Sequence, residues 1–313
     1  MYTSKQDKIT KENPPEMYFE GKDLRMAQAI YKEDVKTIEY LIKQEHYDVN
    51  GRGSIIDTAW SPNPIRYTYL NYAVMTGKIK SVEKLLALRA DINLTADEQG
   101  GGAYNANINI ACYNDNKEMI RLLVRYKENL NPELSESPIN TLLRNGNVDR
   151  SMIDLLLQNG ADINHKEYFS GDMPILTAIA IGKYDYVNYF LDKGANPVAS
   201  DYNGTTLAWS LQHDIWMGTL TDQGLKETLK IKDRLINQFH IKFPVKAEIK
   251  KAIEENIQRY ESLSQADKEL LGEVEGKRIE ELKDSLSKGV TVFGKSIDSL
   301  EEASMQPPAN YKE

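Results

Sequence analysis

Cysteine is almost absent from this chain of 313 residues, in which Cys112 is the only one. A single thiol cannot build an internal disulfide framework or a cysteine-based zinc site. Histidine is also scarce, and the four residues follow no metal-ligand spacing: His46, His165, His213 and His240. The chain has no H-E-x-x-H motif and no G-x-S-x-G nucleophile elbow. We therefore expect a chain that is not an enzyme and that needs no metal or cofactor.

The chain also lacks a basic excess and a long apolar run. Lys and Arg total 39 against 47 Asp and Glu, which gives a formal charge of −8. This balance argues against non-specific nucleic-acid binding or anionic-membrane binding as the main activity, because both need a basic face. No apolar run is long enough to cross a bilayer. With 41% hydrophobic residues, the chain can still bury a substantial core.

The N-terminal residues 1–19 lack the apolar segment that a secretory signal peptide requires. We interpret them as a polar leader, similar to the tether that follows the lipidated cysteine of bacterial lipoproteins. Two interpretations remain open. The chain is either cytoplasmic, or it is a mature secreted chain whose signal has been removed, which implies a periplasmic location and a possible lipid anchor.

Internal repetition is the strongest signal in the sequence. Five segments end in the same way on an asparagine, at Asn50, Asn93, Asn131, Asn164 and Asn196. Each ending follows a leucine-rich helical stretch, such as the one that contains Leu85 and Leu86. A small-residue pair and a turn come before most of these stretches, as in Ala73-Val74 followed by Gly77. The pattern predicts paired helices that bury their leucines against neighbouring pairs.

These features resemble the ankyrin repeat family. Two units open on Ser137-Pro138-Ile139 and Met173-Pro174-Ile175, and the first of them closes on Gly160-Ala161-Asp162-Ile163-Asn164. Cys112 occupies the second small position of its unit, which predicts a buried core residue. The resemblance covers residues 20–240. It implies an all-α fold, an ankyrin-repeat solenoid of about six helix-turn-helix units that acts as a non-catalytic protein-binding module.

Two of the loops between repeats are longer than the family pattern, at residues 51–67 and 94–105. Aromatic side chains lie in or beside these loops: Trp60, Tyr67, Tyr69 and Tyr104. Exposed aromatic residues on long loops are typical of binding hot spots. The alternative for Trp60 is that it folds back over the edge of a repeat.

The repeat pattern stops after residue 240. Apolar periodicity predicts one helix over 245–263 and a second over 264–288, with Gly289 as its stop. We expect the segment 241–298 to cap the end of the solenoid or to form an added arm, and the need for solubility favours the cap. Residues 299–313 are polar and are expected to form a flexible tail.

Residues 289–296 match the P-loop spacing G-x-x-x-x-G-K-[ST]. A true P-loop lies between a buried strand and a helix. Here the charged segment EELKDSLSK precedes it, so we interpret the match as coincidence.

The resemblance places the partner on the concave face, where it would touch the loop tips and the variable end of each first helix. This register gives eleven candidate partner-binding residues: Trp60, Tyr67, Tyr69, Met75, Tyr104, Tyr113, Arg144, Tyr168, Trp209, His213 and Trp216. Trp209 has an alternative place in the core.

Overall similarity extends to bacterial ankyrin-repeat immunity proteins, which neutralise phospholipase toxins of type VI secretion in the periplasm. It implies a toxin inhibitor that covers the active site of a lipase or blocks the movement of its lid. The alternative is an ankyrin scaffold, or a secreted bacterial effector that binds a host protein in the cytosol.

Overall fold

The computed structural model describes residues 4–53, 65–98, 106–145, 149–309 and 311, apart from the side chains of Ile65, Asp97, Glu98 and Leu270. The chain divides into two compact units, unit 1 over residues 1–162 and unit 2 over residues 163–313. None of the helices in the described part is long and apolar enough to cross a membrane.

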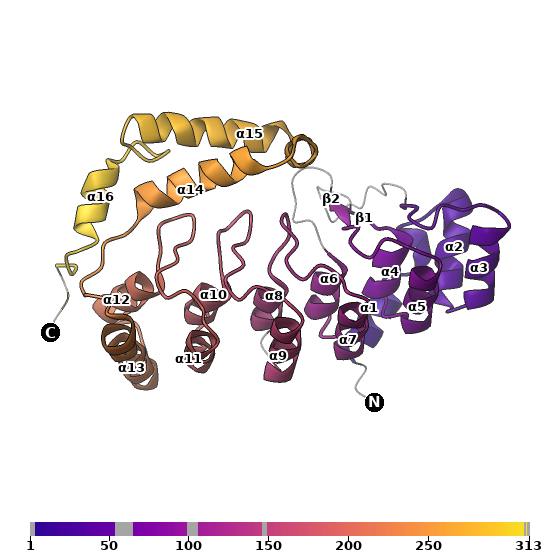
Figure 1. Cartoon of the computed structure of the whole chain (residues 1–313), viewed down its shortest axis with the longest axis horizontal. Coiled ribbons are helices and arrows are strands. Elements are labelled where there is room, and N and C mark those ends of the chain that lie inside the picture. Colours follow the sequence, from indigo (N-terminus) through magenta and orange to yellow (C-terminus); the bar gives the residue numbers. More distant parts are fainter. Residues whose placement is uncertain (1–3, 54–64, 99–105, 146–148, 310, 312–313) are drawn as a thin grey trace. The chain divides into compact units, whose positions relative to one another are not determined.

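Unit 1 is built mainly from antiparallel helix pairs (Figure 1). Its pairs are α2 and α3, α4 and α5, α6 and α7, and α8 and α9. The elements are α1 (Lys5–Glu12), the 3-10 helix η1 (Pro15–Met17), α2 (Gly21–Tyr31), α3 (Val35–Lys43), β1 (Ile65–Arg66), α4 (Tyr69–Met75), α5 (Ile79–Ala87), β2 (Asp97–Glu98), α6 (Asn107–Tyr113), α7 (Lys117–Arg125), α8 (Pro138–Arg144) and α9 (Arg150–Gln158).

Unit 2 contains two further helix pairs, α10 with α11 and α12 with α13, followed by three C-terminal helices (Figure 1). The elements are α10 (Pro174–Ala180), α11 (Tyr184–Asp192), α12 (Leu207–Met217), α13 (Asp222–Phe239), α14 (Ile249–Ser262), α15 (Gln265–Ser287) and α16 (Ile297–Ala303).

The first helices of several pairs start where the sequence supplies a local start signal. The side chain of Thr68 accepts a hydrogen bond from the backbone amide of Asn71 and so caps α4. Pro138 and Pro174 occupy the first helical turn of α8 and α10. Helix α6 lacks both signals. The amide of Ile108 instead donates to the buried carboxyl of Glu128 at 2.8 Å, which replaces the missing cap.

The turn between the helices of a pair repeats with the same geometry. In four pairs the amide of the residue before the second helix donates to the carbonyl oxygen of an alanine in the first helix, at 2.8–3.0 Å: Asp34 to Ala29, Lys78 to Ala73, Asn116 to Ala111 and Lys183 to Ala178. The preceding residue is left-handed each time: Glu33, Gly77, Asp115 and Gly182. Two of these are not glycine, so the hydrogen bond outweighs the steric cost of a side chain there.

The repeat-ending asparagines form a ladder between adjacent pairs. In four of the five, the side-chain oxygen accepts a hydrogen bond from a backbone amide in the ending of the next repeat, at 2.7–2.9 Å: Asn50 from Asp91, Asn93 from Asn129 and Asn131 from Asp162 in unit 1, and Asn164 from Asn196 in unit 2. We call this series the asparagine ladder. It fixes the exit of each repeat to its neighbour and explains why the asparagine recurs.

The long loops of unit 1 also pair with each other. Strand β1 lies antiparallel to β2, with Ile65 opposite Glu98 and Arg66 opposite Asp97. The guanidinium of Arg52 donates to the carbonyl of Thr95 at 2.9 Å. The otherwise helical fold therefore carries a two-residue ribbon where the loops are longest.

The polar leader is more ordered than the sequence indicates. Residues 5–12 form α1, whose start is capped by Ser4 and Asp7 in a reciprocal capping box. Pro15 and Phe19 are buried in unit 1. The expectation of a tether over residues 1–19 is wrong for residues 4–19, because their side chains pack on the first helices of unit 1.

The C-terminal segment differs from the prediction in three respects. The helix expected over 264–288 is interrupted at Gly272, where φ is 75° and ψ is 179°. Val274 follows this kink and is exposed rather than part of an apolar face. The expected flexible tail is helical up to Ala303, and Glu301 within it is buried.

Helices α14 and α15 lie over the loops that project from the repeats of unit 2 (Figure 1). Lys166 pairs with Glu255 at 2.7 Å, and the hydroxyl of Tyr168 donates to Glu275 at 3.1 Å. Arg259 donates to the carbonyl of Lys166 at 2.8 Å. These two helices therefore form neither a cap over α13 nor a free arm.

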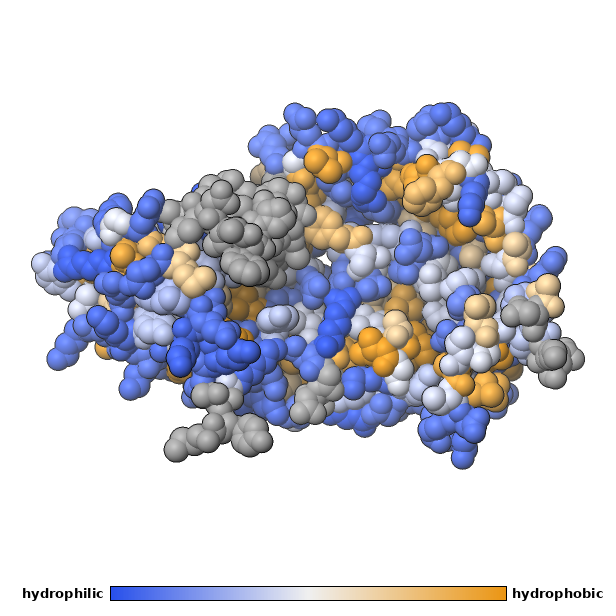
Figure 2. Space-filling view, turned by 180° about the vertical axis from the view of Figure 1, so that it is seen from behind, coloured by the Kyte–Doolittle hydropathy of each residue, from blue (hydrophilic) through white to orange (hydrophobic). Residues whose placement is uncertain are grey.

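Apolar side chains remain exposed on the last helix pair. They are Met217 on α12 and Leu225, Leu229 and Ile236 on α13, and apolar surface of this kind is orange at the lower right of Figure 2. A terminal repeat normally carries a polar outer face. The expected cap over this surface is not provided by α14 and α15.

Cys112 lies fully buried in α6, as its small-residue position predicts. Burial raises the pKa of its thiol well above the usual value, and the nearby carboxyls of Glu128 and Asp115 act in the same direction. The thiol is therefore a neutral packing group.

The asparagine ladder gives the first testable prediction. Asn93→Ala leaves the amide of Asn129 without its acceptor, so the free energy of unfolding should fall by about 1 kcal/mol. Asn159→Ala is the matched control, because the Asn159 side chain donates only within its own helix, to Leu155. Urea unfolding followed by circular dichroism measures both. Equal stabilities for the two variants would contradict a role for the ladder.

Glu128 gives the second prediction. Burial raises the pKa of its carboxyl well above the ordinary 4.5, although amides of Ile108 and Asn107 act against the shift. The native state then keeps a proton that the unfolded chain has released, so stability falls as pH rises above about 4.5. Glu128→Gln keeps an acceptor for Ile108 without ionising, so it should unfold at a higher temperature than wild type at about pH 8 and at a similar one at about pH 4. Exposed Glu281→Gln is the control and should follow wild type at both pH values.

Candidate functional site

A cavity of about 420 Å³ opens on unit 1 beside the C-terminal ends of the first helices. We call the surface formed by these ends, on α2, α4, α6 and α8, the first-helix surface. The cavity is lined by residues from α1, α4, α6, α8 and the loops before α4 and α8: Ile9, Asn13, Tyr67, Met75, Asn109, Ile110, Tyr113, Asn114, Glu136 and Thr141. Tyr67, Met75 and Tyr113 were predicted from the sequence, and the structure brings them together.

The apolar wall of the cavity comes from residues at helix ends. Met75 is the last residue of α4, and Tyr113 is the last residue of α6. Met75 is only 7% exposed, whereas Tyr113 is 63% exposed with the ammonium of Lys5 at 4.6 Å from its ring centre. Tyr113 is therefore the predicted aromatic residue of this surface that is most available to a partner.

The polar side of the cavity contains a buried acceptor that has no partner. Asn109 is 3% exposed, and its side-chain nitrogen donates to the carbonyl of Glu136 and to the hydroxyl of Thr141. Among the described residues nothing donates to its side-chain oxygen. Arg144 joins this side through an ion pair with Glu136 at 3.2 Å. A buried acceptor without a donor is costly.

Three further predicted residues meet in unit 2. Trp209, His213 and Trp216 from α12 line a cavity of about 250 Å³, whose other wall is the chain from Ala303 to Pro308. The rings of Trp209 and His213 stack with centres 5.0 Å apart. Gln212 holds that wall in place by donating to the carbonyl of Ser304 at 3.0 Å. Trp209 is partly exposed, which favours the surface interpretation over the core one.

Two predicted residues are buried and cannot contact a partner in this structure. Tyr69 is 1% exposed, because it lies in the first turn of α4, stacks on Phe19 and donates its hydroxyl to Asp23. Tyr168 is 2% exposed, because α15 covers it and Glu275 accepts its hydroxyl. The prediction of an exposed binding role is wrong for both. Trp60 and Tyr104 lie outside the described residues.

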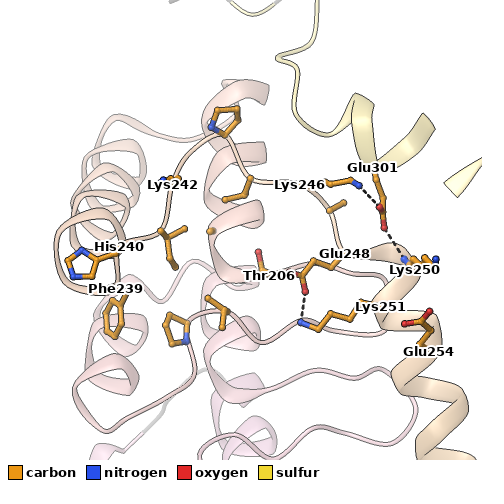
Figure 3. Close-up of a pocket in the computed structure, with 17 residues that line it drawn as sticks. Thr206, Phe239, His240, Lys242, Lys246, Glu248, Lys250, Lys251, Glu254 and Glu301 are labelled. Atoms are coloured by element: carbon orange, nitrogen blue, oxygen red, sulfur yellow. Dashed lines mark hydrogen bonds and ion pairs between the residues drawn. The ribbon is translucent and has the colours of Figure 1, made fainter. Parts of the chain in front are cut away.

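A larger cavity of about 840 Å³ lies in unit 2 between the chain after α13 and the start of α14 (Figure 3). Its charged lining consists of four lysines and three glutamates: Lys242, Lys246, Lys250, Lys251, Glu248, Glu254 and Glu301. Figure 3 shows that Lys246 pairs with Glu301 and that Lys251 pairs with Glu248. Because lysines and glutamates are nearly balanced, this cavity has no strong preference for an anion.

Glu301 binds the first turn of α14 at the edge of that cavity. Its carboxylate accepts the backbone amide of Lys250 at 2.9 Å and the ammonium of Lys246 at 2.8 Å. It therefore occupies the N-terminal end of α14, where a negative charge is favourable. Burial pushes the pKa of Glu301 upward, but the bonds from Lys246 and Lys250 outweigh burial and hold it below the ordinary value.

The segment with the P-loop spacing is a tight connection between α15 and α16. The amide of Thr291 donates to the carbonyl of Lys295, that of Gly294 to Thr291 and that of Ile297 to Gly289, all at 2.8–3.0 Å. These amides are used inside the loop and do not form a cradle for phosphate. Among the described residues no group of three or more potential ligands could hold a metal ion.

Several cavity residues were not predicted, among them Ile9, Asn13, Asn109, Glu136 and Thr141. The first two belong to the segment interpreted as a leader. The spacing of Ser4 and Asp7, which form the capping box of α1, is the local signal that could have indicated a helix there. The three others have no distinctive pattern in the sequence.

Comparison with known proteins identifies the fold. The ankyrin repeat domain of Bcl-3, described as a unique member of the IκB protein family, matches this chain with a TM-score of 0.53 and 20% identity, over 69% of this chain and 87% of that one. The predicted all-α ankyrin-repeat fold of about six helix pairs is confirmed. No family model matches the chain.

Two curated proteins share a shorter stretch of sequence. The ADP-ribosylation factor GTPase-activating proteins AGD4 and AGD2 of Arabidopsis thaliana are 34% and 36% identical to this chain over 77 residues, which is 25% of the chain. The match spans only 9% of the length of each of these proteins.

The position of Glu301 gives a pH-dependent prediction. Because its pKa is lowered in the folded chain, its stabilising effect is present above about pH 4.5 and is lost as the pH falls. Glu301→Gln should therefore lower the stability by about 1 kcal/mol at neutral pH, and the difference from wild type should vanish in acid. Thermal unfolding across the pH range measures this, with exposed Glu302→Gln as the control. A difference that persists in acid would contradict the assigned ion pair.

Proposed function

We propose that this chain is a non-catalytic protein-binding module that holds its partner on the first-helix surface of unit 1. The cavity beside Met75 and Tyr113 is the observation that carries the proposal. It combines an exposed aromatic ring, an apolar wall and a buried acceptor in Asn109 that lacks a donor. Interfaces with this composition bind protein side chains, and aromatic residues dominate their energetics.

The cavity favours one kind of anchor from the partner. An apolar stem would pack against Met75, Ile110 and Tyr113, and a polar group at its tip would lie on the side of Asn109, Glu136 and Thr141. Lysine, arginine and glutamine side chains have this form. The net charge of −8 supports a partner with a basic face, since opposite charges speed association.

The partner that we propose is a bacterial type VI secretion toxin of the phospholipase type, and the chain would be its immunity protein. The support is the similarity in overall character to bacterial ankyrin-repeat immunity proteins. In this proposal the chain works in the periplasm and covers the active site of the lipase or holds its lid. A lipid anchor at the native N-terminus is part of the same proposal.

The second candidate is an ankyrin scaffold, or a secreted effector that binds a host protein in the cytosol. The partial match to two GTPase-activating proteins favours this candidate, because there a comparable stretch is a small part of a much longer chain. We do not propose GTPase-activating activity for this chain, because the match covers only 9% of the length of each of these proteins.

A direct inhibition assay separates the two candidates. The purified chain is added in equimolar amount to the phospholipase toxin encoded beside its gene, and hydrolysis of a fluorogenic phospholipid is followed. Loss of activity at a one-to-one ratio, together with growth of cells that express both proteins, is expected for an immunity protein. Full lipase activity in an excess of the chain would remove this candidate and leave the scaffold.

The partner surface is tested by a matched pair of tyrosines. Tyr113→Ala should weaken partner binding about thirtyfold, as expected for an aromatic hot spot. Tyr126→Ala is the control, because Tyr126 is also exposed but caps the C-terminal end of α7, the second helix of its pair. Titration calorimetry with the captured partner measures both, and circular dichroism checks that each variant is folded. Equal losses for the two tyrosines would place the partner elsewhere.

A further inference from the structure

Helix α1 is held by its contacts and not by its own stability. It has only eight residues, and none of them is buried. A helix of this length is unstable alone in water. Its single apolar residue is Ile9, which borders the cavity. The contacts of α1 with the first-helix surface must therefore supply its order, and nearly all of them are polar.

The first-helix surface presents a row of backbone acceptors. The last carbonyl groups of a helix have no partner within the helix, and they carry the negative end of its dipole. Three such oxygens accept donors from α1. They are those of Met75 and Thr76 at the end of α4, and that of Tyr113 at the end of α6.

The donors on α1 match this row. The side-chain amide of Gln6 donates to the carbonyl of Met75 at 3.0 Å. The hydroxyl of Thr10 lies 2.8 Å from the carbonyl of Thr76 and 2.8 Å from that of Gln6, so it shares its proton between α4 and its own helix. The ammonium of Lys5 donates to the carbonyl of Tyr113. Two of these oxygens also accept a side-chain amide from the neighbouring repeat, Met75 from Asn114 and Tyr113 from Asn145, so α1 adds a second donor to each of them.

The surface also donates to α1 in return. Asn116 donates to the side chain of Gln6 at 3.1 Å, and the hydroxyl of Tyr31 donates to the carbonyl of Thr10 at 3.1 Å. Gly77 lies directly under Gln6, where a Cβ atom would come within 2.6 Å of the Gln6 amide carbon. Shape and hydrogen bonding therefore agree in placing a helix here.

We propose that the first-helix surface of unit 1 is a docking surface for a helix with amide, hydroxyl and ammonium donors, and that α1 is its built-in occupant. The inference deepens the proposed function, because the partner would present a helix of the same donor chemistry and displace α1. Because the contacts of α1 are mostly polar, a partner helix with the same donors can replace α1 on this surface. Helix α14, in contrast, is held by apolar packing, because its buried Ile253 and Ile257 pack with Ile279 and Ile297.

The experiment uses the full chain and needs no partner. In Gln6→Ala/Thr10→Ala both donors to α4 are removed, while alanine preserves helix propensity. Exchange of the amides of residues 8–12 should become about thirtyfold faster, the effect of two lost hydrogen bonds. The control is Lys8→Ala/Lys11→Ala, which changes two exposed side chains of α1 and should exchange like wild type.

A labelled peptide with the sequence of residues 4–14 then probes the vacated surface. Fluorescence anisotropy should show saturable binding to Gln6→Ala/Thr10→Ala, and at least tenfold weaker binding to wild type and to the lysine control. A scrambled peptide should bind none of them. Unchanged exchange in the double variant would overturn the occupancy of the surface by α1, and absence of peptide binding would overturn its role as a docking surface. Neither measurement uses the toxin, so the proposal of a phospholipase toxin as partner can prove wrong while this inference still holds.

Discussion

The hydrogen bond that a repeat-ending asparagine accepts from a backbone amide of the next repeat fixes neighbouring helix pairs to one another within each unit. Asn93 and Asn131 illustrate it in unit 1, where each side chain accepts an amide from the following exit. A single pair has no core of its own, so its position depends on such contacts with its neighbours. The first helices of unit 1 end side by side because their exits are fixed in this way.

That alignment gives unit 1 its chemical character. Helices of seven residues, such as α4 and α6, have few internal backbone hydrogen bonds, and several of their terminal carbonyl groups have no partner within the helix. Neighbouring repeats satisfy some of them, as when Asn114 donates to Met75. Helix α1 also donates to Met75, and to the carbonyl groups of Thr76 and Tyr113. An acceptor-rich surface therefore follows from short, aligned helices.

Much of the fold could be predicted because its signals are local and repeated. The asparagines, the prolines that start α8 and α10, and the buried Cys112 all follow from repeat register. The site was less predictable, because exposure depends on contacts between distant segments. Tyr67 and Tyr69 are close in the sequence, yet only Tyr67 lines the cavity, since Tyr69 turns inward in α4. Tyr168 is hidden by α15, more than a hundred residues later, and no local pattern signals such a contact.

The burial of the lone thiol has a practical consequence for spectroscopy. Since the cysteine of α6 is fully buried, and burial raises its pKa, it is a poor nucleophile toward maleimides. A second cysteine, introduced on an exposed position of α1 such as Lys8, would therefore carry a spin label or dye at one defined place. The buried native thiol therefore leaves the introduced cysteine as the preferred site of labelling.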